Sequence, residues 1–307
     1  MRARRAFVRA RQAFAVVALT ACAGGLAGAL PASAGAAARP ITSPSVVAGS
    51  RYLALGDSVT FGYMESNVVP PPNYLDPSSF IGYPRMVGAA LRLKVTNAAC
   101  PGETSSSLIN TSAPSNGCES SPPPNTSPSY RSRFPLHVGY KGSQLAFAVK
   151  YLRGHRNVRL VSLLIGANDL LRCVSTTPDG CASASERQSV LAVIRQNVGV
   201  ILSTIRRKAG YRGQLVILTQ YSPDYTSAFF TNGVRDLNST VETAAKPFRV
   251  LIANGFGQFY QGALQSGAKP CTAALLTQLG APGRCGVHPS YAGQSLLAVA
   301  VERAVHH

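Results

Sequence analysis

The chain has 307 residues, 46% of them apolar, which suffices for one large domain or two small ones. No repeat period and no heptad pattern is visible, so the sequence excludes repeat arrays and coiled coils. The formal net charge is +18, and removing five arginines within the first 11 residues leaves about +13. The longest basic run, Arg206–Lys208, lies where a helix C-terminus favours cations. We therefore expect no nucleic-acid partner. A solvated basic surface that associates weakly with anionic cell walls or membranes is the better interpretation.

Residues 1–34 have the three parts of a secretory signal: an arginine-rich start, an apolar run and a small-residue cleavage site at Pro31–Ala34. The apolar run is also long enough to span a bilayer. The paired arginines near the start resemble a twin-arginine export signal, and Leu19–Cys22 resembles a lipoprotein box that would leave Cys22 lipidated. Because the apolar segment continues past Cys22 to the cleavage site, we favour simple secretion of a bacterial protein.

An even set of cysteines follows the leader, which in an exported chain predicts disulfides. Their separations fit no zinc-site pattern, so we expect no metal. Sequence alone leaves the pairing open, but the sequential arrangement is the simplest because each pair closes a short loop. The six are Cys100, Cys118, Cys173, Cys181, Cys271 and Cys285.

Strand patterns alternate with helix patterns after a tether over residues 35–50, which predicts a parallel sheet covered by helices on both faces. We expect a three-layer α/β/α sandwich with five strands, formed by a single domain over residues 51–307. A proline-rich stretch over residues 110–141 is expected to lack regular structure and to act as a lid or substrate-binding wall. In chain order the predicted elements are a strand over Tyr52–Leu55, a loop over 64–82, a helix over Tyr83–Leu91, a strand over Leu93–Ala98, a helix around Leu145–Leu152, a strand over Val158–Ile165, a helix over Glu186–Ala209 with a capping box at Ser185 and Gln188, strands over Leu215–Leu218 and Phe248–Ile252, and a helix over Tyr291–Val305.

Polar signatures follow three of these strands: Gly56-Asp57-Ser58, then Gly102, then Gly166-Ala167-Asn168-Asp169. A fourth signature, His288-Pro289-Ser290, precedes the last helix. The carboxyl ends of parallel strands share one edge of a sheet, so these groups can converge there. Ser58 at such a turn is either a helix cap or a nucleophile.

The order Ser, Gly, Asn, His resembles the SGNH (GDSL-type) hydrolase family, from about Arg51 to the end of the chain. The resemblance implies a flavodoxin-like fold and a secreted, monomeric lipase or esterase without cofactor or metal, acting on a small-molecule or lipid ester. It also implies that Ser58 attacks the ester to form an acyl-enzyme and that His288 is the general base and acid. The oxyanion hole would comprise the backbone N–H groups of Ser58 and Gly102 and the side-chain amide of Asn168.

The chain departs from the family pattern in one place. The family usually has an aspartate three residues before the histidine, but Cys285 occupies that position and Gly286 follows. Some secreted members orient the histidine through a backbone carbonyl. The resemblance therefore implies a Ser58–His288 dyad with the carbonyl of Cys285 or Gly286 as acceptor, and Asp224 and Asp236 are the weaker alternatives.

Other functions fit the sequence less well. There is no P-loop and no G-x-S-x-G elbow. A carbohydrate O-deacetylase of the same fold is the alternative enzyme, and a non-catalytic wall-binding protein that keeps the fold is the alternative from another class. The ester that is cleaved has no readable signature in the loops over 64–82 and 110–141.

Overall fold

The computed structural model describes residues 43–123, 127–281 and 283–306. The predicted signal peptide, Cys22 and the first half of the predicted tether, residues 35–42, lie outside the described residues, so the export route and the lipid-anchor alternative stay predictions.

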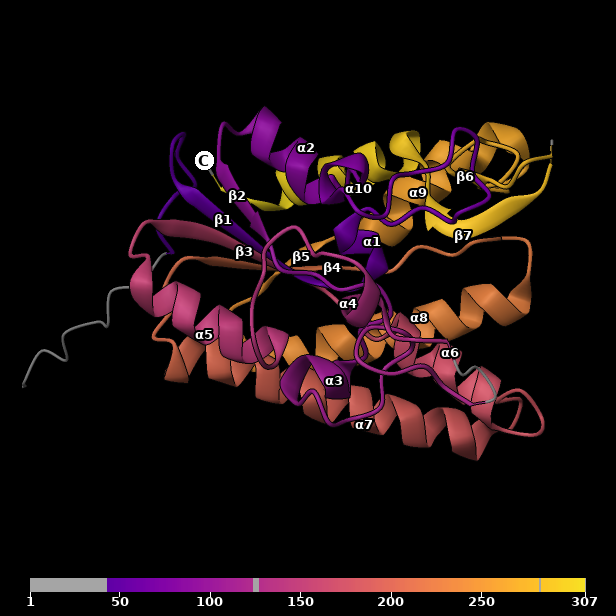
Figure 1. Cartoon of the computed structure of the whole chain (residues 1–307), viewed down its shortest axis with the longest axis horizontal. Coiled ribbons are helices and arrows are strands. Elements are labelled where there is room, and N and C mark those ends of the chain that lie inside the picture. The colour runs from indigo at the N-terminus through magenta and orange to yellow at the C-terminus, as the bar shows by residue number, and fades with distance from the viewer. Residues whose placement is uncertain (1–42, 124–126, 282, 307) are drawn as a thin grey trace, which may run out of the picture. The chain divides into compact units, whose positions relative to one another are not determined.

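A five-stranded parallel sheet forms the centre of the fold, in the order β2-β1-β3-β4-β5 (Figure 1). This order is that of flavodoxin-like doubly wound sheets, and it confirms the predicted α/β class. The strands are β1 (Arg51–Gly56), β2 (Lys94–Asn97), β3 (Val158–Leu164), β4 (Gln214–Leu218) and β5 (Leu251–Ala253).

Helices cover both faces of the sheet because side chains alternate along each strand and both sets are apolar. Leu53 and Leu55 of β1 belong to the core on one face, and Tyr52 and Ala54 belong to the core on the other. The first face packs against α3 (Ser105–Ile109), α5 (Gln144–Gly154), α7 (Ala184–Ser203) and α8 (Ala228–Ala245); the second packs against α2 (Tyr83–Ala90), α9 (Gly255–Ala263) and α10 (Tyr291–Ala304) (Figure 1).

Short elements at the carboxyl edge of the sheet complete the fold. They are α1 (Ser58–Phe61), α4 (Tyr130–Arg133), α6 (Ala167–Thr176), and an antiparallel hairpin of β6 (Leu276–Gln278) and β7 (Cys285–Pro289). The short 3₁₀ and π turns are Pro77–Ser79, Thr204–Lys208, Lys246–Phe248 and Leu264–Ser266.

Helix α7 begins differently from the prediction. The predicted capping box at Ser185 and Gln188 is wrong, because the side chain of Ser183 caps the helix by accepting from the N–H of Glu186. Within the described residues one helical stretch, Ala184–Lys208, is long and apolar enough to cross a membrane. Its residues Ile194, Val198 and Ile201 are buried in the core, as in the core helix of a globular domain.

The last strand is also displaced from its predicted range. The sequence predicts Phe248–Ile252, but Lys246–Phe248 form a 3₁₀ turn and Arg249 adopts a left-handed conformation with φ of 52°. These residues cannot continue a ladder, so β5 begins at Leu251.

The sequential pairing of the cysteines is confirmed, with disulfides 100–118, 173–181 and 271–285. Three disulfides are consistent with an extracellular protein. The 100–118 disulfide joins the turn after β2 to the proline-rich stretch, and the 271–285 disulfide fastens the β6–β7 hairpin to the chain before it.

Gln144, the first residue of α5, joins the ends of β1 and β2. Its buried side chain accepts from the N–H of Gly56 at 2.6 Å and donates to the carbonyl of Gly56 and to the carboxyl of Glu103, both at 3.0 Å. This amide therefore fixes the spacing between the turn before Ser58 and the turn at Gly102.

Gln144→Ala is expected to lower the free energy of unfolding by about 2–4 kcal/mol, because it removes the acceptor of a buried N–H and leaves a cavity. Urea denaturation measures this change. Gln188→Ala, at an exposed position of α7, is the matched control and should stay within about 0.5 kcal/mol of the wild type. Equal stability of the two variants would show that Gln144 does not hold these turns.

Candidate active site

Ser58 lies two residues after the end of β1 as the first residue of α1, and it is buried. The helix cap is its neighbour Asp57, whose Oδ1 accepts from the N–H of Val59 at 3.0 Å. Burial raises the pKa of Asp57 to about 7. Because Asp57 caps the helix, the hydroxyl of Ser58 is available for another partner.

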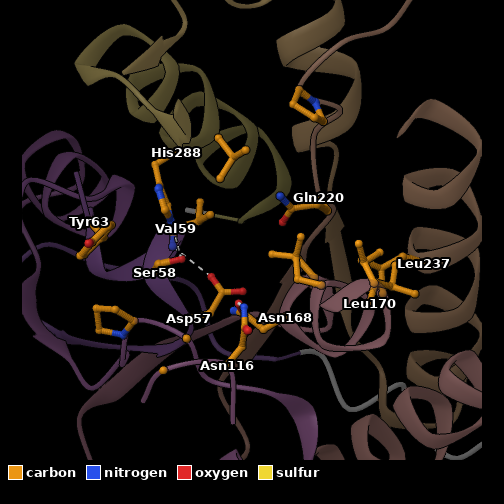
Figure 2. Close-up of a pocket in the computed structure, with 18 of the residues that line it drawn as sticks. Asp57, Ser58, Val59, Tyr63, Asn116, Asn168, Leu170, Gln220, Leu237 and His288 are labelled. Carbon is orange, nitrogen blue, oxygen red and sulfur yellow. Dashed lines mark hydrogen bonds between the residues drawn. The ribbon is translucent and has the colours of Figure 1, made fainter. Parts of the chain in front are cut away.

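That partner is His288 in the β6–β7 hairpin. Its Nε2 lies 3.0 Å from Oγ of Ser58 (Figure 2). Its Nδ1 lies 2.8 Å from Oε1 of Glu65. An ionised carboxylate only accepts hydrogen bonds, so Nδ1 carries the proton and Nε2 of the neutral ring accepts from the Ser58 hydroxyl. The ring of Tyr63 packs edge-on against the imidazole, with centroids 4.8 Å apart.

The expected backbone acceptor for His288 is therefore wrong, since the Glu65 carboxylate occupies Nδ1. The two alternative aspartates are wrong as well. Asp224 binds the N–H and hydroxyl of Thr226 in its own turn, and Asp236 lies exposed at the rim of the pocket.

Glu65 has further partners on the hairpin. Oε2 accepts from the hydroxyl of Thr277 at 2.6 Å, and Oε1 also accepts from the N–H of Val287 at 3.2 Å. Burial alone would raise the pKa of Glu65, but the charge and hydrogen bond of His288 and the hydrogen bond of Thr277 outweigh it. They lower the pKa to about 2, so the carboxylate stays ionised at neutral pH.

Gly286 makes room for this carboxylate. A Cβ at that position would lie 2.0 Å from Oε1 of Glu65 and 2.6 Å from Oγ1 of Thr277. Any other residue would push the Glu65 side chain away from His288.

The candidate oxyanion donors lie around the same pocket as Ser58. Gly102 adopts φ of +82°, and a Cβ there would lie 2.5 Å from the carbonyl oxygen of Asn116, so only glycine fits. Oδ1 of Asn168 accepts from the side chain of Asn116 at 2.9 Å, which orients the amide. Among the hydrogen bonds of the described residues, none uses the N–H of Ser58, the N–H of Gly102 or Nδ2 of Asn168.

Asp169 joins the helix that carries Asn168 to the segment that follows Gly102, and it thereby fixes the distance between these two candidate donors. Its carboxylate accepts from the N–H of Ser105 at 2.8 Å and from the Ser105 hydroxyl at 2.6 Å, which joins α6 to α3. Burial raises the pKa of Asp169 to about 6. These contacts give Asp169 a structural role.

A pocket of about 1130 Å³ opens beside these groups. Part of the proline-rich stretch forms one wall through Asn116, Tyr130 and Phe134, and α6 and α8 form the opposite wall. The stretch is not wholly irregular, because Tyr130–Arg133 form α4.

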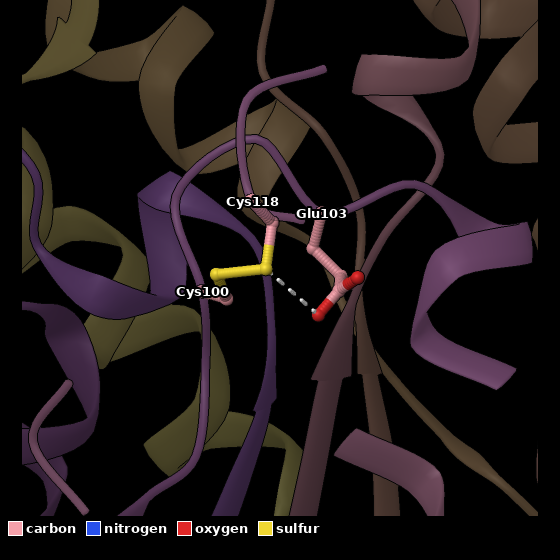
Figure 3. Close-up of side chains that lie close together, drawn as sticks. All are labelled: Cys100, Glu103 and Cys118. Atoms are coloured by element: carbon pink, nitrogen blue, oxygen red, sulfur yellow. Dashed lines mark hydrogen bonds between the residues drawn. A yellow bond between two sulfur atoms is a disulfide. The ribbon is translucent and has the colours of Figure 1, made fainter. Parts of the chain in front are cut away.

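Two clusters of described residues have a spacing that could suit a metal, but both contain disulfides. Cys100, Glu103 and Cys118 lie close together (Figure 3). Both sulfurs are bonded to each other, so neither is a thiolate ligand. Cys173 and Cys181, near Glu186, are paired in the same way.

Residues 54–296 match the model of the GDSL-like Lipase/Acylhydrolase family. The chain belongs to this family. The GDSL hydrolases are lipases and esterases, so the protein is an ester hydrolase. No curated protein matches the sequence.

Solved structures share the fold of this GDSL hydrolase at low sequence identity. Phospholipase A1 from Streptomyces albidoflavus aligns with a TM-score of 0.51 and 19% identity over 84% of this chain and 100% of its own. A lipase from a goat rumen metagenome aligns with a TM-score of 0.52 and 15% identity over 83% of this chain and 97% of its own. A catalytic mutant of an acetylxylan esterase from Geobacillus stearothermophilus aligns with a TM-score of 0.50 and 18% identity over 85% of this chain and 96% of its own.

The motif residues of the GDSL hydrolase thus meet at one pocket, while Glu65 is the residue that sequence reasoning missed. It follows Ser58 by seven positions, in a loop without a recognisable motif. The one available signal was scarcity: the chain has only 12 acidic residues, so few could reach the histidine.

Glu65→Gln is expected to reduce stability in a pH-dependent way. The folded-state pKa of about 2 lies below the ordinary 4.5, so the carboxylate stabilises the fold fully above pH 4.5 and loses this effect as pH falls toward 2. The difference in unfolding free energy between wild type and variant should therefore shrink between pH 5 and pH 3 in urea titrations. A difference that stays constant over this interval would contradict the depressed pKa.

Proposed function

We propose that this GDSL hydrolase is a secreted serine esterase in which Ser58, His288 and Glu65 act as a catalytic triad. The observation that carries the proposal is the unbroken chain of hydrogen bonds from Oγ of Ser58 through His288 to the Glu65 carboxylate. A serine hydroxyl is a weak nucleophile, and a base within hydrogen-bond reach activates it.

The reaction proceeds in two halves. Oγ of Ser58 attacks the ester carbonyl while Nε2 of His288 takes its proton, and the resulting imidazolium gives that proton to the departing alcohol. Water then attacks the acyl-enzyme, again with Nε2 as base, and the acid leaves as Oγ of Ser58 regains its proton.

The oxyanion formed in each half requires donors that are already in place. We assign this role to the N–H groups of Ser58 and Gly102 and to the amide of Asn168. Their freedom from other hydrogen bonds within the described residues supports the assignment. Each such donor typically contributes about 10²–10³-fold to turnover.

Glu65 holds His288 in the tautomer that this mechanism needs and stabilises the imidazolium. An intact Ser58–His288–Glu65 chain also favours an enzyme over a wall-binding protein that merely keeps the fold. The disulfides and the predicted leader support secretion.

Ser58→Ala is expected to lower kcat for p-nitrophenyl esters by about 10⁶-fold and to abolish labelling by a fluorophosphonate probe. Ser239→Ala, at an exposed position on α8, is the matched control and should label like the wild type. A folded wild type that is not labelled would refute the serine mechanism.

Glu65→Gln and Gly286→Ala are expected to impair the same step. The first removes the charge at Nδ1, and the second displaces the carboxylate, so kcat should fall by about 10²–10⁴-fold with little change in KM. Gly139→Ala, where a Cβ would meet no atom within 4 Å, should keep full activity. If both site variants retained wild-type kcat, the Ser58–His288 pair alone would suffice.

A further inference from the structure

The pocket beside Ser58 has two walls of different chemistry. One wall is aromatic and consists of Tyr63, Tyr74, Tyr130 and Phe134, whose rings contact one another with centroids 5.1–6.5 Å apart. The other is formed by apolar residues of α6 and α8, which we call the α6–α8 cleft. Its residues are Leu170, Leu171, Val174, Phe229, Phe230 and Leu237.

The position of His288 assigns the two walls to the two halves of an ester. The alcohol that leaves takes its proton from Nε2 of His288, so it must lie on the side of the imidazole. That side is the aromatic wall, because Tyr63 contacts the imidazole at 4.8 Å. The acyl group must then extend away from His288.

The α6–α8 cleft begins where the acyl group would start. Asn168 and Leu170 both belong to the first turn of α6, and Leu237 packs over Gly166, where a Cβ would lie 2.7 Å from its Cδ1. In Figure 2 Leu170 and Leu237 lie together on the opposite side of Ser58 from Tyr63.

The far end of the cleft is open to solvent and still apolar. Leu171 and Val174 are 46% and 43% exposed, and Phe229 and Phe230 are 59% and 45% exposed. Of the polar residues that line this side, Arg187, Asn232 and Asp236 are partly or fully exposed and lie at the rim, whereas Gln220 lies on the same side of Ser58 as Leu170 and Leu237 (Figure 2).

We propose that the α6–α8 cleft binds the acyl chain of long-chain esters, so that the enzyme prefers fatty acyl esters to acetyl esters. This inference rests on the proposed serine esterase mechanism. An acetyl group would leave nearly all of the apolar wall in water, whereas each buried methylene of a longer chain lowers the free energy of binding. The pocket, at about 1130 Å³, is large enough for such a chain, because pockets for drug-sized ligands have about 300–1,000 Å³.

The test is kcat/KM for p-nitrophenyl esters from acetate to laurate, below their critical micelle concentrations. We expect kcat/KM to rise about fourfold for each added methylene until the chain reaches the exposed rim. Leu170→Trp fills the cleft and should lower the laurate-to-acetate ratio at least tenfold. Leu264→Trp, on an exposed apolar residue outside the pocket, should leave that ratio unchanged.

The outcomes separate the two proposals. A chain-length profile that is flat or highest for acetate, with hydrolysis still abolished by Ser58→Ala, would overturn the acyl-chain assignment and leave the serine mechanism intact. Hydrolysis that persists undiminished in Ser58→Ala would overturn the serine mechanism. An equal fall of the ratio in Leu170→Trp and Leu264→Trp would show that the cleft does not select the acyl chain.

Discussion

The close backbone contact at Gly56 is the constraint on which the site depends. Gly56 ends β1 opposite Leu164, and a Cβ there would lie 2.3 Å from the carbonyl oxygen of Leu164. The missing side chain lets Gly56 lie against Leu164 and against Thr60, whose Oγ1 would lie 2.5 Å from that Cβ. Gln144 binds both backbone groups of Gly56, and the N–H of Cys100 donates to its carbonyl. The end of β1 is thereby fixed to β3, to α5 and to the turn after β2. Ser58, two residues later, starts from a position that these contacts determine.

The central fold could be predicted from the sequence because its signals are local. Val158–Ile165 is apolar on both faces, and β3 occupies nearly that range because a strand covered by helices on both sides needs this pattern. The sequences of helix α8 and of the β6–β7 hairpin have no comparable apolar pattern that would predict them. Few large apolar residues of α8 are buried, and the hairpin pairs at only two positions and is fastened by the 271–285 disulfide. Their stability comes from packing and a covalent bond rather than from propensity.

The candidate site also contains residues that could be predicted from the sequence and one that could not. Ser58, Gly102, Asn168 and His288 could be predicted because each stands at a strand end or before a helix, in an order that topology converts into proximity. Glu65 could not, since its contact with His288 spans 223 residues and no local pattern announces it. The sequence showed that the position three residues before the histidine has no carboxylate. It could not show that the glycine at 286 leaves the space into which a carboxylate from another segment fits.

Glu65 and His288 come from different segments of the chain, so the orientation of the histidine ring depends on how these segments pack. In the usual family pattern the acid belongs to the same segment as the histidine, so the two move together. Here the three partners of the imidazole, Ser58, Tyr63 and Glu65, all belong to the segment that follows β1. The hairpin must therefore be held against that segment, and the bond between Thr277 and Glu65 does so with the same carboxylate that binds His288. A shift of the hairpin would break the hydrogen bond of His288 to Ser58 and its hydrogen bond to Glu65 at the same time. The positions of Ser58, His288 and Glu65 thus all depend on one fixed point, the end of β1 at Gly56.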